Sequence, residues 1–321
     1  MAQHFLLSSA ARSLSLSQVM RLSEDEAFKL FTSIRFAQNN GAPFCPKCGG
    51  TECYTYTARK IFKCKACQAQ FSATSGTIFA SRKLELRDIL GAIAIFANGQ
   101  KGHAALQLGR DLDVSYKTAF VLSHKLRESM AAETANAVLS GTVEIDGCYL
   151  GGHIKPANYK EDRKDRRLAE HQTGKRKVVV VMRERYGRTL TTVAKSEAQA
   201  VPVIMQRVAS GSTIHADEAP SWDSLHAHYD VKRINHSVCY SDGIACTNMA
   251  ESFFSRLRRA EVGTHHHIRR AYLSAYASEM AWRENHRRDS NGVQFMQIVQ
   301  GAVKHPVSRQ WKGYWQRHLP K

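Results

Sequence analysis

Two closely spaced cysteine pairs are the feature that most limits how this chain can fold. The first pair is Cys45 and Cys48, and after fifteen intervening residues the second pair is Cys64 and Cys67. Two thiolates that are separated by two residues can reach one ion from a single turn, and two such turns complete a tetrahedral Zn²⁺ site. Because all four positions are cysteine, no position is left open for catalysis, and the pattern predicts a structural zinc site.

The residues between the two pairs indicate the kind of zinc site. They include Tyr54, Tyr56, Ile61 and Phe62, which suit the strands of a hairpin and so favour a zinc ribbon over residues 41–80. The other cysteines have no ligand spacing, and we expect each to be a small buried apolar residue; they are Cys53, Cys148, Cys239 and Cys246. Cysteines that bind metal rather than forming disulfides are typical of a reducing cytoplasm.

The charge balance indicates the class of partner. The 321 residues contain 46 Lys and Arg against 28 Asp and Glu, a formal net charge of +18. Basic side chains that meet phosphates release condensed counterions, so this excess favours a nucleic-acid partner. The net charge alone would also fit a protein whose surface is merely basic. The sequence motifs must therefore distinguish a nucleic-acid partner from such a surface. No apolar run approaches the roughly 18 residues of a membrane span, so we expect none.

Hydrophobic periodicity divides the chain into helical and mixed regions. A helix over 22–38 should begin at Ser23 and stop at Asn39-Asn40-Gly41, and residues 85–130 read as helices. Further on, strands are expected at 142–150, 177–184, 188–194, 212–216 and 231–235, with helices at 197–209, 221–229, 248–260 and 269–285. The alternation of strands and helices after residue 140 predicts an α/β layer. Between the first two strands, residues 153–177 are basic and poor in apolar side chains, which predicts a loop.

Two adjacent helices fit a helix-turn-helix. The first would run from His103 to Asp111, and the second from Ser115, which can cap it, to about Arg127. The outward side of the second helix is expected to carry Tyr116, Lys117, Thr118, His124 and Lys125. Basic residues on such a helix can contact DNA, which makes Lys117 and Lys125 candidate contacts. The alternative is an ordinary helical linker.

Three acidic residues lie where catalytic groups are commonly placed. Asp146 and Asp217 each end an apolar strand, and Glu251 lies on a helix with an apolar face. Carboxylates are the ligands that Mg²⁺ and Mn²⁺ prefer, and a pair of such ions can activate the attacking oxygen and stabilise the leaving oxygen. Taken singly, each carboxylate is more often a solvated surface group or a helix cap, and the order strand, strand, helix is what favours the joint interpretation.

Several motifs in one order make the chain resemble the zinc-ribbon DDE transposases of bacterial insertion sequences, in the ISXO2-like group. The resemblance runs from about residue 24 to residue 288. The motifs are FCPKCG at 44–49, FSATSGTIF at 71–79, LDVSYKTA at 112–119, VEIDGCYLGG at 143–152, HADE at 215–218, NMAESFFS at 248–255, GTHH at 263–266, Glu279, and WREN at 282–285. Several separate motifs in the right order are more specific than any one of them.

The resemblance implies a fold and a reaction. It implies an RNase H-like catalytic domain in which Asp146, Asp217 and Glu251 are catalytic and bind Mg²⁺ or Mn²⁺. The implied reaction is hydrolytic cleavage of 3′ ends at terminal inverted repeats, followed by transfer of those ends to target DNA. Because transposition joins two element ends, we expect a homodimer or a larger assembly on double-stranded DNA, in the cytoplasm of a bacterium at the nucleoid.

The chain departs from the family pattern at two positions. Where the family often has an acidic residue after the first aspartate, this chain has Gly147, and where it usually has lysine beyond the glutamate, the candidate is Arg258. Arginine can still hold a phosphate. Since some relatives place asparagine at the third catalytic position, Asn248 is the fallback ligand.

The sequence therefore predicts an α+β multidomain protein that is a DNA transposase. The expected parts are an N-terminal helical segment (1–40), a zinc ribbon (41–80), a helix-turn-helix domain (81–135), an RNase H-like catalytic domain (140–290) and a basic C-terminal tail (291–321). The main alternative is a non-enzymatic DNA-binding regulator or a decayed transposase. A third reading is an RNase H-like nuclease without strand transfer.

Overall fold

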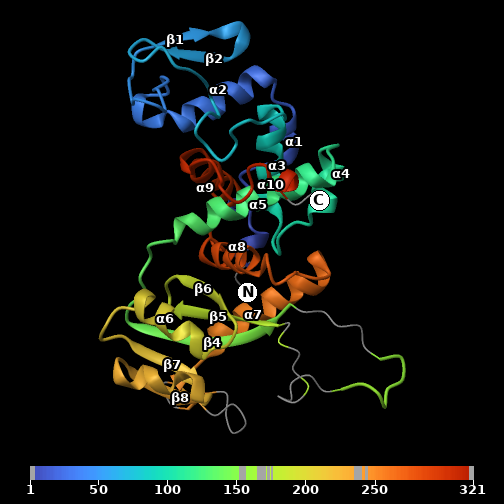
Figure 1. The fold of residues 1–321 in the computed structure, drawn as a ribbon, viewed down its shortest axis with the longest axis vertical. Coiled ribbons are helices and arrows are strands. Elements are labelled where there is room, and N and C mark those ends of the chain that lie inside the picture. The colour runs from blue at the N-terminus through green and yellow to red at the C-terminus, as the bar shows by residue number, and fades with distance from the viewer. Residues whose placement is uncertain are drawn as a thin grey trace. The chain divides into compact units, whose positions relative to one another are not determined.

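The computed structural model divides the chain into two compact units, which are described separately. It describes residues 4–151, 157–164, 171, 174, 176–234, 241–242 and 245–317. The first unit contains residues 1–133 and 288–321, and the second contains residues 134–287 (Figure 1). Most of the loop expected at 153–177 lies outside the described residues, as does Cys239.

The zinc-ribbon region of the first unit is a small antiparallel sheet. Strands β1 (Cys53–Tyr56), β2 (Ile61–Cys64) and β3 (Gln70–Ser72) pair in the order β1-β2-β3. A short helical turn (Thr57–Arg59) joins β1 to β2, and Lys60 closes it with a φ of 51°. The predicted hairpin between the cysteine pairs is thus confirmed, and a third strand follows the second pair.

The rest of the first unit is helical. Its longer helices are α1 (Leu16–Met20), α2 (Glu24–Arg35), α3 (Leu86–Asn98), α4 (Ala105–Asp111), α5 (Tyr116–Glu133), α9 (Asn291–Lys304) and α10 (Tyr314–Arg317). The predicted start of α2 is confirmed, because Ser23 and Glu26 form a capping box. The neighbouring Glu24 carboxylate accepts the backbone N–H groups of Leu86 and Arg87, both at 3.0 Å, and so caps α3.

The C-terminal segment differs from the basic tail that composition predicts. Residues 291–304 form α9, which packs against α2, α3 and α5. Its buried face is formed by Gln294, Phe295, Ile298, Val299, Ala302 and Val303. These residues recur at helical spacing, so they form an apolar stripe that the helix buries. The prediction of a tail considered only the net charge of the segment, which does not reveal such a stripe.

The turn between α4 and α5 is tight. Asp113 has a φ of 50°, and the N–H of Val114 returns to the carbonyl of Gly109 at 2.9 Å. A Cβ at Gly109 would lie 3.0 Å from the carbonyl oxygen of Val114 and 3.5 Å from Cβ of Ala119. Gly109 therefore allows the two helices to approach closely.

The second unit contains a five-stranded mixed sheet. Strands β4 (Thr142–Leu150), β5 (Lys177–Glu184), β6 (Thr189–Ala194), β7 (Thr213–Asp217) and β8 (Asp230–Ile234) lie in the order β6-β5-β4-β7-β8. β4, β5 and β6 pair antiparallel, whereas β7 runs parallel to both β4 and β8. Strands β9 (Ser241–Asp242) and β10 (Ala245–Cys246) form a separate two-stranded sheet, in which β10 packs against β7 and β8.

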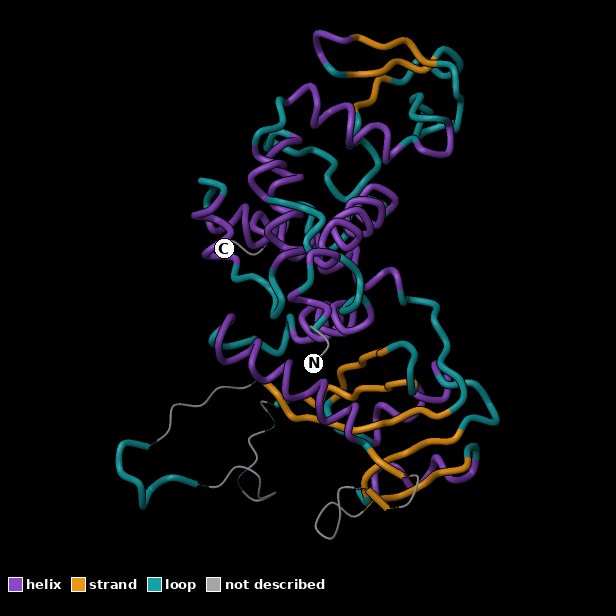
Figure 2. The backbone as a smooth tube through the Cα atoms, turned by 180° about the vertical axis from the view of Figure 1, so that it is seen from behind, coloured by secondary structure: helices purple, strands orange, loops and turns teal. Residues whose placement is uncertain are grey.

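Helical segments cover both faces of this sheet (Figures 1 and 2). One face buries Val143 and Ile145 beneath α6 (Val201–Arg207) and a 3₁₀ segment (Pro220–Ala227). The other face buries Cys148 and Leu150 beneath α7 (Asn248–Ala260) and α8 (Leu273–Asn285). Alternate residues of β4 thus belong to two separate cores, as strand geometry requires.

Most of the predicted elements of the second unit are confirmed. The five strands lie within two residues of their expected positions, and the run Val178–Val181 is wholly buried at the centre of the sheet. The expected helix at 221–229 is wrong in type, because residues 220–227 form a 3₁₀ helix whose buried side chains are Trp222 and Leu225. Among the described residues, no helix has both the length and the apolar character that a membrane span requires.

Candidate active site and metal centre

The four paired cysteines converge in the ribbon. Cys45 and Cys48 precede β1, Cys64 ends β2, and Cys67 lies in the turn before β3. All four Sγ atoms lie within 4.8 Å of one another. Cys45 Sγ is 3.5 Å from Cys67 Sγ, and Cys48 Sγ is 3.6 Å from Cys64 Sγ. A tetrahedral Zn²⁺ with Zn–S bonds of about 2.3 Å needs sulfur atoms about 3.8 Å apart, so these four cysteines can bind one zinc ion.

Backbone amides favour the thiolate forms of Cys45 and Cys64. The N–H of Gly50 acts in the same way on Cys48, but hydrogen bonds with the Cys67 and Cys64 thiols outweigh it and raise the pKa of Cys48 to about 12. Burial opposes ionisation of Cys45, but the N–H groups of Cys48 and Lys47 outweigh it and lower the pKa of Cys45 to about 7. Of the other cysteines, Cys148 is buried as expected, whereas Cys53 and Cys246 are only half-buried. The expectation of full burial is therefore wrong for Cys53 and Cys246.

Strand register places two of the predicted catalytic residues side by side. In the parallel pair of β4 and β7, Glu144 lies opposite His215. Asp146 and Asp217 each follow two residues later, at the carboxyl end of β7 and on one face of the sheet. The Asp146 carboxylate accepts the N–H of Gly147 at 2.6 Å.

Helix α7 brings the third acidic residue to the same face. Ala250, Phe253 and Phe254 of α7 belong to the core that contains Cys148 of β4. Glu251 lies in the first turn of α7, and its charge acts on Asp146. Asn248, the fallback ligand, is the first residue of α7 and is exposed. The structure therefore brings Asp146, Asp217 and Glu251 together.

The electrostatics of Asp146 reflect this clustering. Burial raises the pKa of Asp146 to about 7, the N–H of Gly147 opposes the rise, and the charges of Asp217, Glu197 and Glu251 add to it. Like charges and low solvent access both disfavour the ionised carboxylate. A divalent cation would reverse this preference, and carboxylate oxygens are the donor type that Mg²⁺ and Mn²⁺ bind.

Asp217 is held by the 3₁₀ segment that follows β7. Its Oδ1 accepts the indole N–H of Trp222 at 2.8 Å and the backbone N–H of Ala219 at 3.2 Å. Trp222 is fully buried in the core of the sheet. The rigid ring therefore fixes the orientation of the Asp217 carboxylate.

Arg258 lies close to the acidic cluster. It is exposed, and its Nη2 lies 3.1 Å from Sγ of Cys148, which follows Asp146 by two residues on the same face of β4. Its guanidinium stands 6.0 Å from the ring centre of Phe254. Arg258 thus places a positive charge beside the cluster, where a phosphate could approach.

The sequence-based reasoning missed two further carboxylates of this unit. Glu144 is fully buried in β4, and Glu197, just after β6, acts electrostatically on Asp146 and Asp217. Glu144 had a detectable signal, since it is a charged residue inside an apolar strand and shares a face with Asp146. Glu197 had none, because its position depends on how β6 leads into the following helical turn.

The predicted DNA contacts on α5 have different surroundings. Lys117 is exposed near the start of the helix, and its Nζ lies 5.5 Å from the ring centre of Trp315. The indole N–H of Trp315 also donates to the Lys117 carbonyl at 3.1 Å. Lys125 is half-buried, and burial lowers its pKa, opposed by the charge of Glu128.

The expected outward position of His124 is wrong. Its side chain is fully buried, and its ring stacks on Trp311 with centroids 4.2 Å apart. Phe120 lies on the same side of α5 and contacts the rings of Trp311, Tyr314 and Trp315. The chain's last aromatic residues therefore cover this side of α5, which sequence periodicity cannot foresee.

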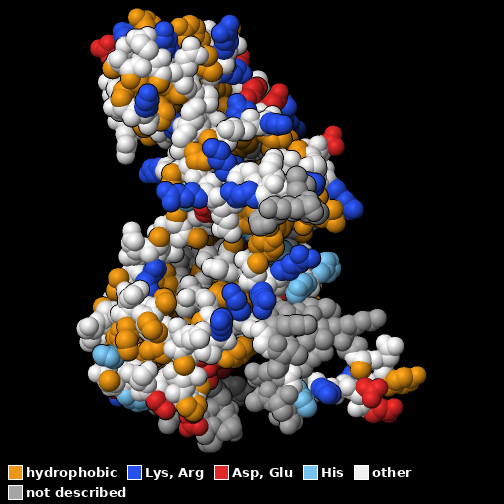
Figure 3. Space-filling model, viewed as in Figure 1, with side chains coloured by type: hydrophobic (Ala, Val, Ile, Leu, Met, Phe, Trp, Pro, Cys, Tyr) orange, Lys and Arg blue, Asp and Glu red, His pale blue; other side chains and the backbone are white. Residues whose placement is uncertain are grey.

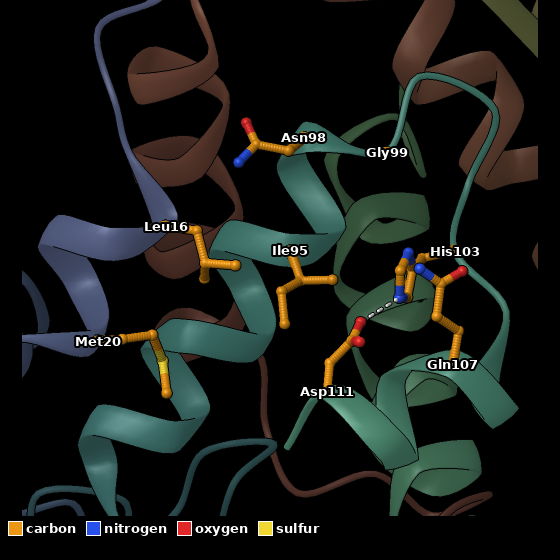
Figure 4. Close-up of a pocket in the computed structure, with 8 residues that line it drawn as sticks. All are labelled: Leu16, Met20, Ile95, Asn98, Gly99, His103, Gln107 and Asp111. Carbon is orange, nitrogen blue, oxygen red and sulfur yellow. Dashed lines mark hydrogen bonds and ion pairs between the residues drawn. The ribbon is translucent and has the colours of Figure 1, made fainter.

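The first unit also contains a pocket. It has a volume of about 450 Å³ and is lined by residues of α1, α3, α4 and the segment before α4. His103 and Asp111 point toward one another across it, with Nε2 and Oδ2 3.2 Å apart (Figure 4). This contact joins the start and the end of the first helix of the expected helix-turn-helix, which is a structural role.

The surface agrees with a polyanionic partner. In the face shown in Figure 3, Lys and Arg side chains outnumber Asp and Glu side chains over the helical part of the first unit. The net charge of the chain is +18. Such an excess of positive charge attracts nucleic acid over a wide area of surface.

Comparison with known proteins matches most of the second unit and the zinc-ribbon part of the first unit to known families. Residues 138–285 match the model of the ISXO2-like transposase domain, and residues 22–70 match that of the transposase zinc-ribbon domain. The chain is also 26% identical, over 251 residues, to an uncharacterized protein in the transposable element ISH50 of Halobacterium salinarum. This alignment covers 74% of this chain and 83% of that protein. No solved structure matches the chain.

A zinc ribbon followed by a transposase domain defines the class of protein, a transposase. The chain belongs to the zinc-ribbon transposases of the ISXO2-like group. Because both domains are those of proteins that act on DNA, they imply that this chain binds DNA.

Proposed function

We propose that the chain is a metal-dependent DDE transposase that cleaves the 3′ ends of an insertion sequence and transfers them to target DNA. One observation carries the proposal: Asp146, Asp217 and Glu251 cluster on one face of the sheet, within the ISXO2-like transposase domain. The strand order β6-β5-β4-β7-β8, with the first three antiparallel, supports an RNase H-like catalytic domain over about 140–290.

Each residue has a distinct proposed role. Asp146 and Asp217 hold Mg²⁺ or Mn²⁺ from two adjacent strands, and Glu251 closes the site from α7. Bound there, such ions supply activation of the attacking oxygen and stabilisation of the leaving oxygen. Arg258 contacts a phosphate of the DNA beside the cluster, and Trp222 keeps the Asp217 carboxylate oriented toward it.

DNA recognition is proposed for the first unit. The zinc ribbon over 41–80 and a helix-turn-helix within 81–135 bind the terminal inverted repeats, with α5 as the recognition helix. The tight α4–α5 turn at Gly109 and the capping of α5 by Ser115, whose Oγ accepts the Thr118 N–H at 3.3 Å, support this motif. We further propose that two or more copies assemble on DNA, because two element ends must be joined.

The decisive experiment compares DNA cleavage and strand transfer by the wild type with Asp146→Asn, Asp217→Asn and Glu251→Gln, using authentic element ends and Mg²⁺ or Mn²⁺. Each variant should lose at least about 100-fold in activity, and combining them should add little, because the three residues act as one unit. Asp230→Asn is the matched control: it removes one charge from an exposed carboxylate at the opposite end of the sheet. DNA binding should persist in all of them.

Other outcomes identify the alternatives. Loss of activity in Asn248→Ala with normal rates in Glu251→Gln would make Asn248 the third ligand. Cleavage without joining would identify a nuclease. A wild type that binds element ends but never cuts them would identify a regulator or a decayed transposase.

A further inference from the structure

Glu144 is a charged residue in the interior of the second unit. Its side chain is fully buried, on the face of β4 opposite to Val143 and Ile145 and close to α7. A carboxylate removed from water costs several kcal/mol unless positive charge and hydrogen bonds compensate it. The partners of Glu144 therefore reveal what this residue stabilises.

The first partner is the start of helix α7. Oε2 of Glu144 accepts the N–H of Met249 at 2.8 Å and the N–H of Ala250 at 3.2 Å. These N–H groups belong to the first turn of a 13-residue helix, where no intrahelical acceptor exists and the helix dipole is positive. Glu144 thus supplies, from a strand, the capping interaction that Thr247 at the N-cap position does not supply with its side chain.

The second partner is Arg185, just beyond β5. Its Nε lies 3.4 Å from Oε1 of Glu144, and its Nη2 lies 3.2 Å from Nδ1 of His215 on β7. The same Nδ1 accepts the N–H of Cys246 at 3.1 Å. Arg185 and His215 thereby connect β4 and β7 to Cys246, which lies two residues before the start of α7.

These contacts bear on the position of Glu251. Met249 and Ala250 immediately precede Glu251, and a helix transmits the position of its first turn rigidly to the next residue. Glu144 and Asp146 are two residues apart, so they share a face of β4. One strand therefore carries both Asp146 and the anchor of the helix that brings Glu251 to it.

We propose that Glu144 is a positioning residue that fixes the start of α7 and thereby holds the Glu251 carboxylate against Asp146 and Asp217. The inference rests on the proposed metal-binding role of these three carboxylates. Glu144 itself does not contact the ion; it acts through the backbone of α7. Groups that orient ligands in this way typically change metal affinity by about 10–100-fold when they are replaced.

The test measures Mn²⁺ affinity of the full-length protein by titration calorimetry and electron paramagnetic resonance, without DNA. Glu144→Gln keeps the shape but removes the charge that faces the α7 N-terminus, and Mn²⁺ binding should weaken about 10–100-fold. The matched control is Glu184→Gln on β5, whose carboxylate also accepts backbone N–H groups, from Ser140 at 3.0 Å and Arg188 at 3.2 Å. It should bind Mn²⁺ like the wild type.

A double variant separates positioning from general stability. If Glu144 acts through Glu251, Glu144→Gln should add no loss of Mn²⁺ affinity in a Glu251→Gln background, while its effect on thermal stability should remain. Additive losses of affinity would contradict the proposal. If Glu144→Gln does not fold, Glu144→Asp tests the proposal instead. Its shorter side chain keeps the charge but lengthens both hydrogen bonds to the N–H groups of α7. Glu144→Asp should therefore weaken Mn²⁺ binding about 10-fold.

The outcomes distinguish this inference from the proposed function. A wild type that binds no Mn²⁺ and cuts no element ends would overturn the proposed function itself. A wild type that binds Mn²⁺ specifically, through Asp146 and Glu251, together with folded Glu144 variants of unchanged affinity, would overturn only the positioning role.

Discussion

The Glu197 side chain fills the space beside Gly147 that any larger residue at position 147 would need. Cγ and Cδ of Glu197 lie 2.8 Å and 2.9 Å from the point where a Cβ of residue 147 would stand. The family resemblance led us to expect an acidic residue directly after Asp146. In this chain that position is glycine, and a carboxylate from the segment after β6 approaches Asp146 and Asp217 instead.

This relationship predicts that a small substitution displaces a carboxylate. Gly147→Ala should lower the unfolding free energy by no more than about 1 kcal/mol, because the new methyl group displaces only the end of the flexible Glu197 side chain. In a Glu197→Ala background the same change should cost much less, which a double-mutant cycle by chemical denaturation would measure. Gly263→Ala is the control, since a Cβ there meets nothing within 4 Å. Additive effects of the two changes would mean that the residues do not compete for space.

The raised pKa of Asp146 predicts a pH dependence of stability in the metal-free protein. The folded-state pKa is about 7 against an ordinary value of 3.8, so between these values the folded state holds a proton that the unfolded state has released. Stability from this group is therefore present at low pH and is lost as the pH rises through 7, by at most about 4 kcal/mol.

Denaturation in EDTA between pH 5 and pH 8 measures this effect. Relative to Asp146→Asn, which cannot titrate, the wild type should lose stability as the pH rises. Asp230→Asn, at an exposed position of the same sheet, should keep the wild-type slope. Excess Mg²⁺ should reduce the loss, because metal binding favours the ionised carboxylate. Parallel curves for the wild type and Asp146→Asn would show that Asp146 ionises normally.

Local chemistry explains which parts of the structure could be predicted from the sequence. The cysteine cluster, the start of a helix at Ser23 and the strand that contains Val178–Val181 depend on neighbouring residues, and all three were predicted correctly. The position of Asp217 at the end of β7 likewise follows from local pattern, whereas the expectation that Asp146 ends a strand is wrong, because β4 continues to Leu150. Parallel pairing of the two strands makes the two aspartates neighbours.

The remaining features depend on contacts between distant segments. His124 was expected to be exposed, but Trp311 covers it from almost 190 residues away. The capping of α7 by Glu144 spans more than 100 residues. No period or spacing within either segment contains this information, because it arises only when the chain is folded.

The zinc cluster predicts one Zn²⁺ per chain and a ribbon that depends on it. Cys64→Ser should remove the metal and unfold residues 41–80 locally, since metal binding contributes about 10–16 kcal/mol to the folding of small zinc domains. Cys53→Ser is the control. Cys53 lies opposite Cys64 in the antiparallel register of β1 and β2 but does not belong to the group of four cysteines that can bind zinc. Metal analysis of unchelated protein and proteolysis of the ribbon provide the measurements. Full zinc content in Cys64→Ser would exclude this site.

The last prediction separates the two lysines of α5. Lys117 is exposed near the start of the helix, whereas Lys125 is half-buried with a pKa that burial lowers. Only an exposed ammonium can meet a phosphate without further desolvation, so Lys117→Ala should weaken binding to element ends more than Lys125→Ala does. Each lost phosphate contact should also reduce the slope of log K against log salt by about 0.9.

The neighbouring tryptophan provides a further comparison for this prediction. The ammonium group of Lys117 lies over the ring of Trp315, and the indole N–H of Trp315 donates to the Lys117 carbonyl. Trp315→Phe keeps an aromatic ring but removes this N–H donor. If the ring orients Lys117, Trp315→Ala should weaken DNA binding in the wild type but add little to Lys117→Ala, while Trp315→Phe should retain most of the affinity. Fluorescence anisotropy at several salt concentrations measures all these variants. A salt slope that is unchanged in Lys117→Ala would place the phosphate contacts of the first unit elsewhere, on the ribbon or on another helix.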